Sequence, residues 1–408
     1  MRIAMVSEHA NPLAALGDVD AGGQNVHVAE LSAALCRRGH EVTVYTRRDD
    51  RRQPVTVRTE PGYRVVHLSA GPPRPVPKDE LLPYMNEFAH QLADWLRRDP
   101  PDVIHAHFWM SGMVATLVSR QLAIPTVHTY HALGTVKRRY QGPADTSPED
   151  RIAIERALGR SVTRIIATCS DEVFELVRMG VPRQKISVVP CGVDAEQFSQ
   201  DGKRAARNGR RRVVSVGRLV PRKGFGDLID ALPMVPDTEL LIVGGPRGRD
   251  LDSDPEAGRL RERAARAGVA DRVVLTGQVA RRQMPALLRS ADVVACVPWY
   301  EPFGIVPLEA MACGVPVLAS AVGGLTDTVV DGITGVLVPP RQIRPLGHAL
   351  RRLLLDPGGQ QTLGAAGCDR ARSRYTWDRV ALDTERVYTR SAEAGVRTLF
   401  DSAVGSSR

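Results

Sequence analysis

The sequence is poor in lysine, in paired cysteines and in long apolar segments, and each shortage excludes a class of protein or a kind of site. No run of about 18 apolar residues occurs, so we expect no membrane-spanning segment. The six cysteines lie far apart without a C-x-x-C pair, which argues against a zinc ribbon or redox pair and suits a reducing cytoplasm. The opening MRIAMVSE turns polar after six residues, so we expect a first strand there and not a signal peptide.

The basic residues are almost all arginine. Lysine accounts for five of the 55, and the formal net charge is +9. We interpret this bias as GC-rich codon usage and not as a nucleic-acid surface. A basic cleft for phosphorylated substrates, or a basic patch for anionic lipid, fits the charge better. We therefore predict no nucleic-acid partner and leave peripheral membrane contact open.

Strand and helix signals alternate through the whole chain of 408 residues, a length that suggests two domains. This alternation predicts parallel, doubly wound sheets. A polar, basic stretch at 199–212 interrupts it, and the alternation restarts at RVVSVGR. We therefore predict an α/β protein with two Rossmann-like, doubly wound parallel-sheet lobes, 1–195 and 196–376, that face a central cleft. Ligand-binding residues should follow the strands, because open α/β sheets bind ligands at the carboxyl ends of their strands.

Two local expectations follow from composition. The segment 80–99 predicts a helix whose apolar face packs on the sheet. The charged segment from Lys137 to Asp150 is expected to be irregular.

The stretch VVSVGRLVPRKGF places Arg218 and Lys223 between a strand and a helix. Two cations beside a helix N-terminus suit a diphosphate, because arginine donates in a fork and backbone N–H groups add donors. The stretch is neither a P-loop nor G-x-G-x-x-G, which disfavours nucleotide hydrolysis and NAD binding. A basic surface turn is the alternative interpretation.

The stretch EPFGIVPLEA sets Glu301 and Glu309 eight residues apart across a loop and a helix start. We expect the N–H groups near Gly304, Ile305 and Val306 to be available to an anion. Three interpretations stay open from the spacing: an acid/base pair, a ligand clamp, or a solvated loop acid followed by an acid that complements the helix dipole.

A glycine pair, Gly22 and Gly23, opens a helix after the first strand and would let a ligand approach the backbone. A helix start that merely needs flexibility is the alternative.

Four histidines follow strands of the first lobe, in HAHF and HTYH: His105, His107, His128 and His131. No further residues at convincing ligand spacing accompany them, so we predict no metal site. A histidine at a strand end can donate a hydrogen bond to a sugar hydroxyl or stabilise charge. A satisfied structural histidine is the alternative for each.

These motifs occur in one order, and the whole chain resembles a retaining glycosyltransferase of family 4, which has the GT-B fold. EPFGIVPLEAMACGVPVLAS matches the family's E-x7-E motif and carries most of the resemblance, with support from GRLVPRKG and GGQNV. GGQNV and HTYHALGTVK look most like the branch that contains sucrose-phosphate synthases and the mycothiol-pathway transferase. The fold implies that the C-terminal helix, 377–408, packs back on the first lobe.

The resemblance implies a role for each donor-side residue. Arg218 and Lys223 would grip the donor diphosphate, with Gly304, Ile305 and Val306 adding amides. Glu309 would bind the nucleotide ribose. Glu301 would hold hydroxyls of the transferred sugar. His131 would reach that sugar or stabilise the transition state, and Gly23 would lie against the diphosphate. The family needs no metal or other cofactor, since cations and helix N-termini offset the leaving-group charge.

On the acceptor side the resemblance is partial. Asn25 and Lys78 match acceptor-binding positions of the mycothiol-type enzymes. Phe108, Ala132 and Asp150 depart from the tyrosine, threonine and arginine of that branch, which puts inositol phosphate in doubt as the acceptor.

We therefore predict a cytoplasmic, metal-independent hexosyltransferase that moves a sugar from a nucleotide-diphosphate-sugar, such as a UDP-sugar, to a hydroxyl acceptor, with retention. The acceptor is left as a phosphosugar, a lipid or another metabolite. Three alternatives stay open: a nucleotide-sugar epimerase on the same fold, a glycoside hydrolase using Glu301 and Glu309, and a non-catalytic basic protein that binds nucleic acid or membrane.

Overall fold

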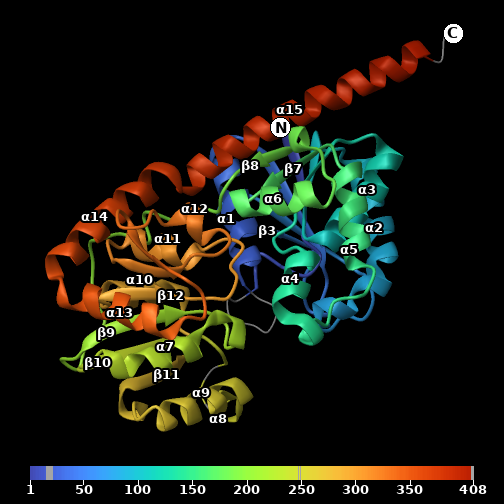
Figure 1. Cartoon of the computed structure of the whole chain (residues 1–408). Coiled ribbons are helices and arrows are strands. Elements are labelled where there is room, and N and C mark those ends of the chain that lie inside the picture. The colour runs from blue at the N-terminus through green and yellow to red at the C-terminus, as the bar shows by residue number, and fades with distance from the viewer. Residues whose placement is uncertain (15–21, 247, 249, 406–408) are drawn as a thin grey trace. The chain divides into compact units, whose positions relative to one another are not determined.

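The computed structural model describes residues 1–14, 22–246, 248 and 250–405, with side chains of the last helix described to residue 393 (Figure 1). The described residues form two compact units. Unit 1 comprises 1–14, 22–190 and 377–405, and unit 2 comprises 191–376. None of the described helices is long and apolar enough to cross a membrane.

Unit 1 is built, within the described residues, on an eight-stranded sheet of order β3-β4-β2-β1-β5-β6-β7-β8. Neighbouring strands are parallel except β3, which runs antiparallel to β4. The strands are β1 (Arg2–Val6), β2 (Glu41–Arg47), β3 (Thr56–Arg58), β4 (Arg64–Leu68), β5 (Val103–His107), β6 (Thr126–Thr129), β7 (Arg164–Ala167) and β8 (Ile186–Val188). The helices are α1 (Gly23–Arg37), α2 (Met85–Arg98), α3 (Trp109–Leu122), α4 (Gly134–Gln141), α5 (Arg151–Ser161), α6 (Ser170–Arg178) and α15 (Trp377–Gly405).

Unit 2 has, within the described residues, a six-stranded parallel sheet of order β11-β10-β9-β12-β13-β14. Counted along the chain this is the order 3-2-1-4-5-6 of a dinucleotide-binding fold. The strands are β9 (Arg211–Val216), β10 (Thr238–Val243), β11 (Val273–Gly277), β12 (Val293–Cys296), β13 (Val317–Ser320) and β14 (Gly335–Val338). The helices are α7 (Phe225–Ala231), α8 (Asp250–Ser253), α9 (Pro255–Arg266), α10 (Met284–Arg289), α11 (Ile305–Ala312), α12 (Leu325–Thr328), α13 (Ile343–Leu355) and α14 (Pro357–Arg374).

The two doubly wound sheets confirm the predicted fold class. The central strands β1 and β10 are buried on both faces, which explains why they contain the continuous apolar runs IAMV and LLIV and not an alternating pattern. The final helix α15 packs against α1 and against β5, β6 and β7 of unit 1 (Figure 1).

Two local expectations need correction. The helix expected over 80–99 begins as 3-10 turns and becomes α-helical at Met85, although its apolar face is in the core as predicted. The segment expected to be irregular from Lys137 contains most of α4, where the Lys137 ammonium lies 3.0 Å from Asp145 and 3.4 Å from Asp79. These tertiary ion pairs stabilise a basic helix that its own sequence favours weakly. The short edge strand β3 has no periodic signal and was not predicted.

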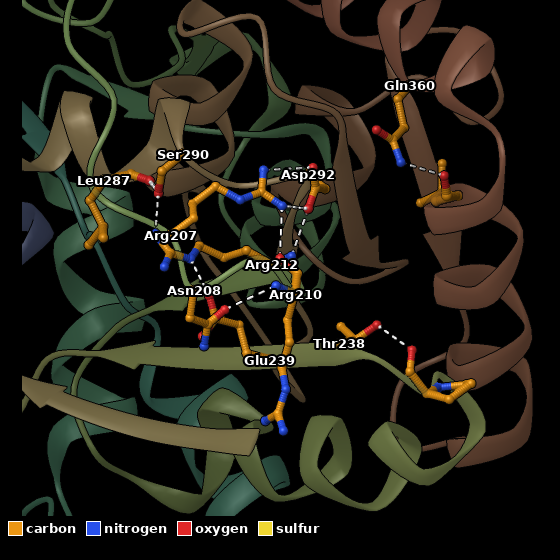
Figure 2. A network of polar contacts seen from close by, with 12 residues as sticks. Arg207, Asn208, Arg210, Arg212, Thr238, Glu239, Leu287, Ser290, Asp292 and Gln360 are labelled. Carbon is orange, nitrogen blue, oxygen red and sulfur yellow. Dashed lines mark hydrogen bonds and ion pairs between the residues drawn. The ribbon is translucent and has the colours of Figure 1, made fainter. Parts of the chain in front are cut away.

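The amino ends of β9, β10 and β12 are joined by a polar network (Figure 2). The Arg212 guanidinium donates to Glu239 at 2.7 Å and to Ser290 at 2.9 Å, and both charged residues are buried. Asn208 donates to the second oxygen of Glu239 at 2.6 Å, and Arg207 pairs with Asp292. The polar stretch that interrupts the alternation therefore supplies side chains that hold the sheet at the end opposite the strand carboxyl ends.

Replacing Arg212 with alanine should lower the free energy of unfolding by about 3–5 kcal/mol, because it leaves Glu239 charged and buried without its main partner. Arg210→Ala is the matched control, since Arg210 pairs with Asp271 at the surface and such pairs contribute about 0–1 kcal/mol. Urea unfolding followed by circular dichroism measures both changes. If the two variants lost the same free energy of unfolding, the larger contribution assigned to the buried Arg212–Glu239 pair would be wrong.

Candidate functional site

In unit 2 the predicted donor-side residues gather where the strand order reverses. β9 and β12 are neighbours in the sheet, and the chain leaves them in opposite directions along the strand order. Arg218 and Lys223 follow β9, and Glu301 follows β12. Such a switch point opens a crevice at the carboxyl ends of the two strands, where open α/β sheets bind ligands.

Lys223 and Glu301 form an ion pair at this point. Lys223 ends the 3-10 turn η5 (Pro221–Lys223), and its ammonium contacts the Glu301 carboxylate, with the two side chains 19% and 16% exposed. A side chain at Gly217 would approach the Lys223 stem to 3.3 Å. Gly224, with φ 75°, lies so close to Val297 that a Cβ would stand 2.0 Å from its carbonyl oxygen. The glycines thus let the lysine loop pack against the end of β12.

The charge state of Glu301 argues against an acid role. Burial raises the pKa of this carboxyl, but the nearby positive charges of Lys223, Arg222 and Arg218 outweigh it, so the pKa lies below its usual value. Glu301 is therefore a carboxylate at neutral pH. A glycosidase acid would need a raised pKa to hold its proton, so the acid/base interpretation of the glutamate pair loses support.

Glu309 lies in α11 and is 3% exposed. Its carboxylate accepts a hydrogen bond from the Arg281 guanidinium at 2.7 Å, and the same guanidinium lies over the Phe198 ring, 5.1 Å from the ring centroid. The first turn of α11 contains no acid, so the interpretation of Glu309 as a residue that complements the helix dipole is wrong. Arg281 follows β11 in ARRQ and was missed, because nothing in its surroundings distinguishes it among the many arginines.

The loop between the two glutamates is shaped by glycine. Gly304, with φ 85°, precedes α11, and the half-buried Ile305 and Val306 are the first helical residues. A second glycine pair, missed in the sequence, packs on this loop: Gly324 donates its N–H to the Glu301 carbonyl at 2.9 Å. A Cβ at Gly323 would stand 2.3 Å from that carbonyl oxygen. The adjacent glycines after the strand PVLAS were the available signal.

In unit 1 the corresponding switch point lies at β1 and β5. Gly23 begins α1 and is exposed, which leaves its backbone accessible. The Asn25 side chain is buried and bound at both ends: its oxygen accepts from the Gly22 N–H at 3.0 Å, and its nitrogen donates to the Asn11 carbonyl at 2.9 Å. Asn25 therefore holds the start of α1 in place.

His131 follows β6 in the left-handed region, with φ 62°, and is 5% exposed. It belongs to a buried group on one face of the sheet that also contains His27 of α1 and His105 and His107 of β5. His107 Nδ1 lies 2.9 Å from His131 Nε2, and the His27 ring centroid lies 5.1 Å from that of His131. His27 was missed, because NVHVAEL looks like ordinary helix.

His128 lies on the other face of the sheet. It pairs in register with Ala106, hydrogen-bonds that residue's carbonyl at 3.0 Å, and approaches Gly112 of α3. The structure therefore separates His128 from the other three predicted histidines, and the structural interpretation applies to it.

Burial lowers the pKa of all five of these histidines, to about 4 for His27, about 3 for His128 and well below the usual value for the rest. They are therefore neutral at physiological pH. Among the described residues no group of three or more His, Cys, Asp or Glu side chains is arranged to hold a metal ion.

The predicted acceptor residue Lys78 stands in the 3-10 turn η1 (Lys78–Glu80) beside Asp79. Burial raises the pKa of Asp79, but a hydrogen bond from Thr146 and the charges of Lys137 and Lys78 bring it below its usual value. Nearby in the fold of unit 1, the buried Arg151 pairs with Glu155 at 2.8 Å.

The three positions that depart from the family pattern surround Arg151. Its guanidinium lies 5.0 Å from the Phe108 ring centroid and donates to the Ala132 carbonyl at 2.7 Å, and Asp150 precedes it in the chain. Arg151 and Glu155 were missed, because an R-x-x-x-E pair in a helix resembles a surface salt bridge.

Comparison with known proteins places the chain in context. The family model described as Glycosyltransferase Family 4 matches residues 21–197, and the model Glycosyl transferases group 1 matches residues 196–370. D-inositol 3-phosphate glycosyltransferase of Xylanimonas cellulosilytica is 36% identical over 416 residues, covering 96% of this chain and 97% of the relative. The protein of the same name from Kribbella flavida is 37% identical over 412 residues, covering 96% of each.

Solved structures of other proteins match nearly the whole chain in fold. Sucrose-phosphate synthase from Thermosynechococcus elongatus matches with a TM-score of 0.87 and 32% identity, covering 98% of this chain and 99% of the other. The Anabaena protein HepE, in a structure with UDP and glucose, matches in fold with a TM-score of 0.74 at 18% identity, covering 95% and 99%.

Proposed function

Because this chain belongs to glycosyltransferase family 4 and has its GT-B fold, we propose that it is a UDP-sugar-dependent enzyme whose donor is held by the glycine-lined loops of unit 2. The predicted activity, transfer of a sugar from a nucleotide-sugar with retention, is confirmed at the level of the family. The epimerase, hydrolase and non-catalytic alternatives lose their support. The choice of UDP draws on the fold match to HepE, whose structures contain UDP and UDP-glucose.

In this proposal Lys223 and Arg218 bind the donor diphosphate, helped by amides near Gly304, Ile305 and Val306. The single observation that carries it is the Lys223–Glu301 pair at the switch point: a cation and a carboxylate meet where a diphosphate and its sugar would join. Glu301 accepts hydrogen bonds from sugar hydroxyls, and Glu309 accepts them from the ribose. In the same proposal the Gly23 backbone binds the diphosphate, and His131 donates a hydrogen bond to the sugar.

The chemistry asked of these groups is electrostatic. The bond between the sugar's anomeric carbon and the diphosphate oxygen breaks, and a bond from the acceptor oxygen to the same face of that carbon forms. The acceptor proton goes to the departing phosphate. Lys223 and Arg218 stabilise the negative charge that develops on the diphosphate, which is the largest single contribution expected in such a site. We expect no metal or other cofactor to be required.

For the acceptor we propose a polyol or sugar hydroxyl, with Lys78 as the residue that meets a phosphate if one is present. The relatives are named for D-inositol 3-phosphate, but Lys137 and Arg151 of this chain are already paired with Asp79, Asp145 and Glu155. Because these cations are already paired with carboxylates, we propose that the acceptor does not need to carry a phosphate group. We propose that the enzyme is cytoplasmic, and peripheral contact with the inner face of the membrane is compatible with this proposal.

Turnover tests the proposal. The protein is incubated with UDP-, GDP- and ADP-sugars, each with myo-inositol or D-inositol 3-phosphate, and nucleoside diphosphate release is measured with EDTA present. A UDP-sugar should support release, and Glu301→Ala should lower kcat. Release that requires added divalent cations, or full turnover in Glu301→Ala, would contradict the mechanism.

A further inference from the structure

His131 does not stand alone in unit 1, and its neighbours bear on how it acts. Building on its proposed role at the donor sugar, we propose that His107 is a positioning residue that orients the His131 ring and selects its tautomer. The link is the buried hydrogen bond between His107 Nδ1 and His131 Nε2, at 2.9 Å. The rings are stacked, with centroids 5.1 Å apart and planes inclined by 28°.

The backbone at His131 explains why such support is needed. β6 ends at Thr129, which pairs in register with His107, and two residues later the chain takes φ 62° at His131. A non-glycine residue in the left-handed region is held there by its surroundings, and such strain concentrates at functional sites. Phe108, with φ 80°, shows the same feature directly after β5. Both strand ends are thus in constrained conformations beside this pair.

A second layer fixes His107. The His105 ring lies 4.1 Å from the His107 ring, and both of its nitrogens are engaged: Nδ1 with the Tyr388 hydroxyl at 2.7 Å and Nε2 with Thr129 Oγ1 at 2.9 Å. Tyr388 is fully buried in α15. The last helix therefore holds His105 through a hydrogen bond from or to the Tyr388 hydroxyl, and His105 in turn packs against the His107 ring.

The other side of His131 is closed by His27. Its ring lies 5.1 Å from His131, edge to face, and 5.4 Å from Trp377 at the start of α15. His131 is thus held by a hydrogen bond on one side and by ring packing on the other.

Because both rings are neutral, the hydrogen bond between His107 and His131 couples their tautomers. Each neutral imidazole has one N–H and one acceptor nitrogen, so the tautomer of His107 determines that of His131. Since Nε2 of His131 faces His107, the tautomer selected there determines whether Nδ1 of His131 carries the proton. A change at His107 would alter the direction and the donor character of that nitrogen without touching the substrate.

The experiment compares His107→Val, which removes the bond, with His107→Asn, which places an amide near the Nδ1 position. His128→Val is the matched control, since His128 is equally buried but lies across the sheet from His131. Donor hydrolysis gives kcat and KM for UDP-glucose, and thermal unfolding verifies folding. Histidine-selective ¹⁵N NMR reports ring tautomers directly and requires no turnover.

We expect His107→Val to lower kcat by about 10–100-fold with KM within about two-fold, as for a misplaced catalytic group. His107→Asn should recover most of that loss, and the His131 ¹⁵N signals should move in His107→Val but not in His128→Val. With His131→Ala as background, His107→Val should add little further loss. Losses that multiply in the double variant, or equal losses in His107→Val and His128→Val, would overturn the positioning role.

The two proposals fail differently. If His131→Ala keeps full activity, the role of His131 at the sugar is wrong, whatever its ¹⁵N signals do. If His131→Ala is inactive but the His131 ring signals ignore His107→Val, the inference about His107 is wrong and the proposed function stands.

Discussion

Lys223→Ala is expected to lower kcat/KM for the nucleotide-sugar donor by about 10²–10³-fold, the effect of removing one preorganised charge from a leaving-group site. Two losses combine in this variant. The diphosphate loses a cation, and the Glu301 carboxylate, whose pKa Lys223 and its neighbouring arginines keep low against the effect of burial, loses its ion-pair partner. Steady-state donor hydrolysis and a direct binding measurement report the change.

Lys203→Ala is the control for this variant, because Lys203 is also in unit 2 but is exposed in the polar stretch before β9. It should leave kcat/KM within about two-fold. If Lys223→Ala behaved like Lys203→Ala, the assignment of the diphosphate to the switch point of unit 2 would be wrong.

Acid is expected to destabilise unit 1 far more than unit 2. Five buried histidines of unit 1 have lowered pKa values through burial: His27, His105, His107, His128 and His131. In the unfolded chain each binds a proton below about pH 6.5, whereas in the folded unit each stays neutral. The unfolded state therefore binds more protons, and stability falls as pH falls through and below 6.5.

The magnitude follows from linkage. One pH unit below the unfolded pKa, each histidine costs about 1.4 kcal/mol, or about 7 kcal/mol for five, which is comparable to the total stability of a typical domain. The buried Glu172 of unit 1, whose pKa burial raises to about 7, acts in the opposite direction and offsets part of this loss. His348 is the single histidine in the sequence of unit 2. Thermal unfolding between pH 8 and 5 should thus show a transition of unit 1 that moves steeply to lower temperature. A transition of unit 1 independent of pH above 5 would contradict the neutral cluster.

The sequence predicted the parts of the site that depend on strand order. Arg218, Lys223 and Glu301 were expected together because each follows a strand, and parallel strands bring their carboxyl ends to one edge of a sheet. Glu309 was placed on the correct helix, but its partner Arg281 was not foreseen, because the partner comes from a different strand end. Pairings between distant loops depend on tertiary register, which local patterns do not contain.

The histidine cluster illustrates the same limit. The HAHF and HTYH motifs marked strand ends, and strand alternation separates His128 from His105 and His107 once the register of β5 and β6 is known. The contributions of His27, Trp377 and Tyr388 arise from helices α1 and α15, which pack on that face. A helix that returns from the other end of the chain leaves no signal near the residues it supports.

The most direct test of the account is a calorimetric titration of the unmodified protein with UDP-glucose and UDP in the presence of EDTA. The account predicts saturable binding of about one molecule per chain without added metal, weakened at least about 30-fold in Arg218→Ala and Lys223→Ala and unchanged in Lys203→Ala, since one charge-assisted contact contributes about 2 kcal/mol or more. Absence of saturable binding for both UDP and UDP-glucose, or equal binding in all three variants, would contradict it.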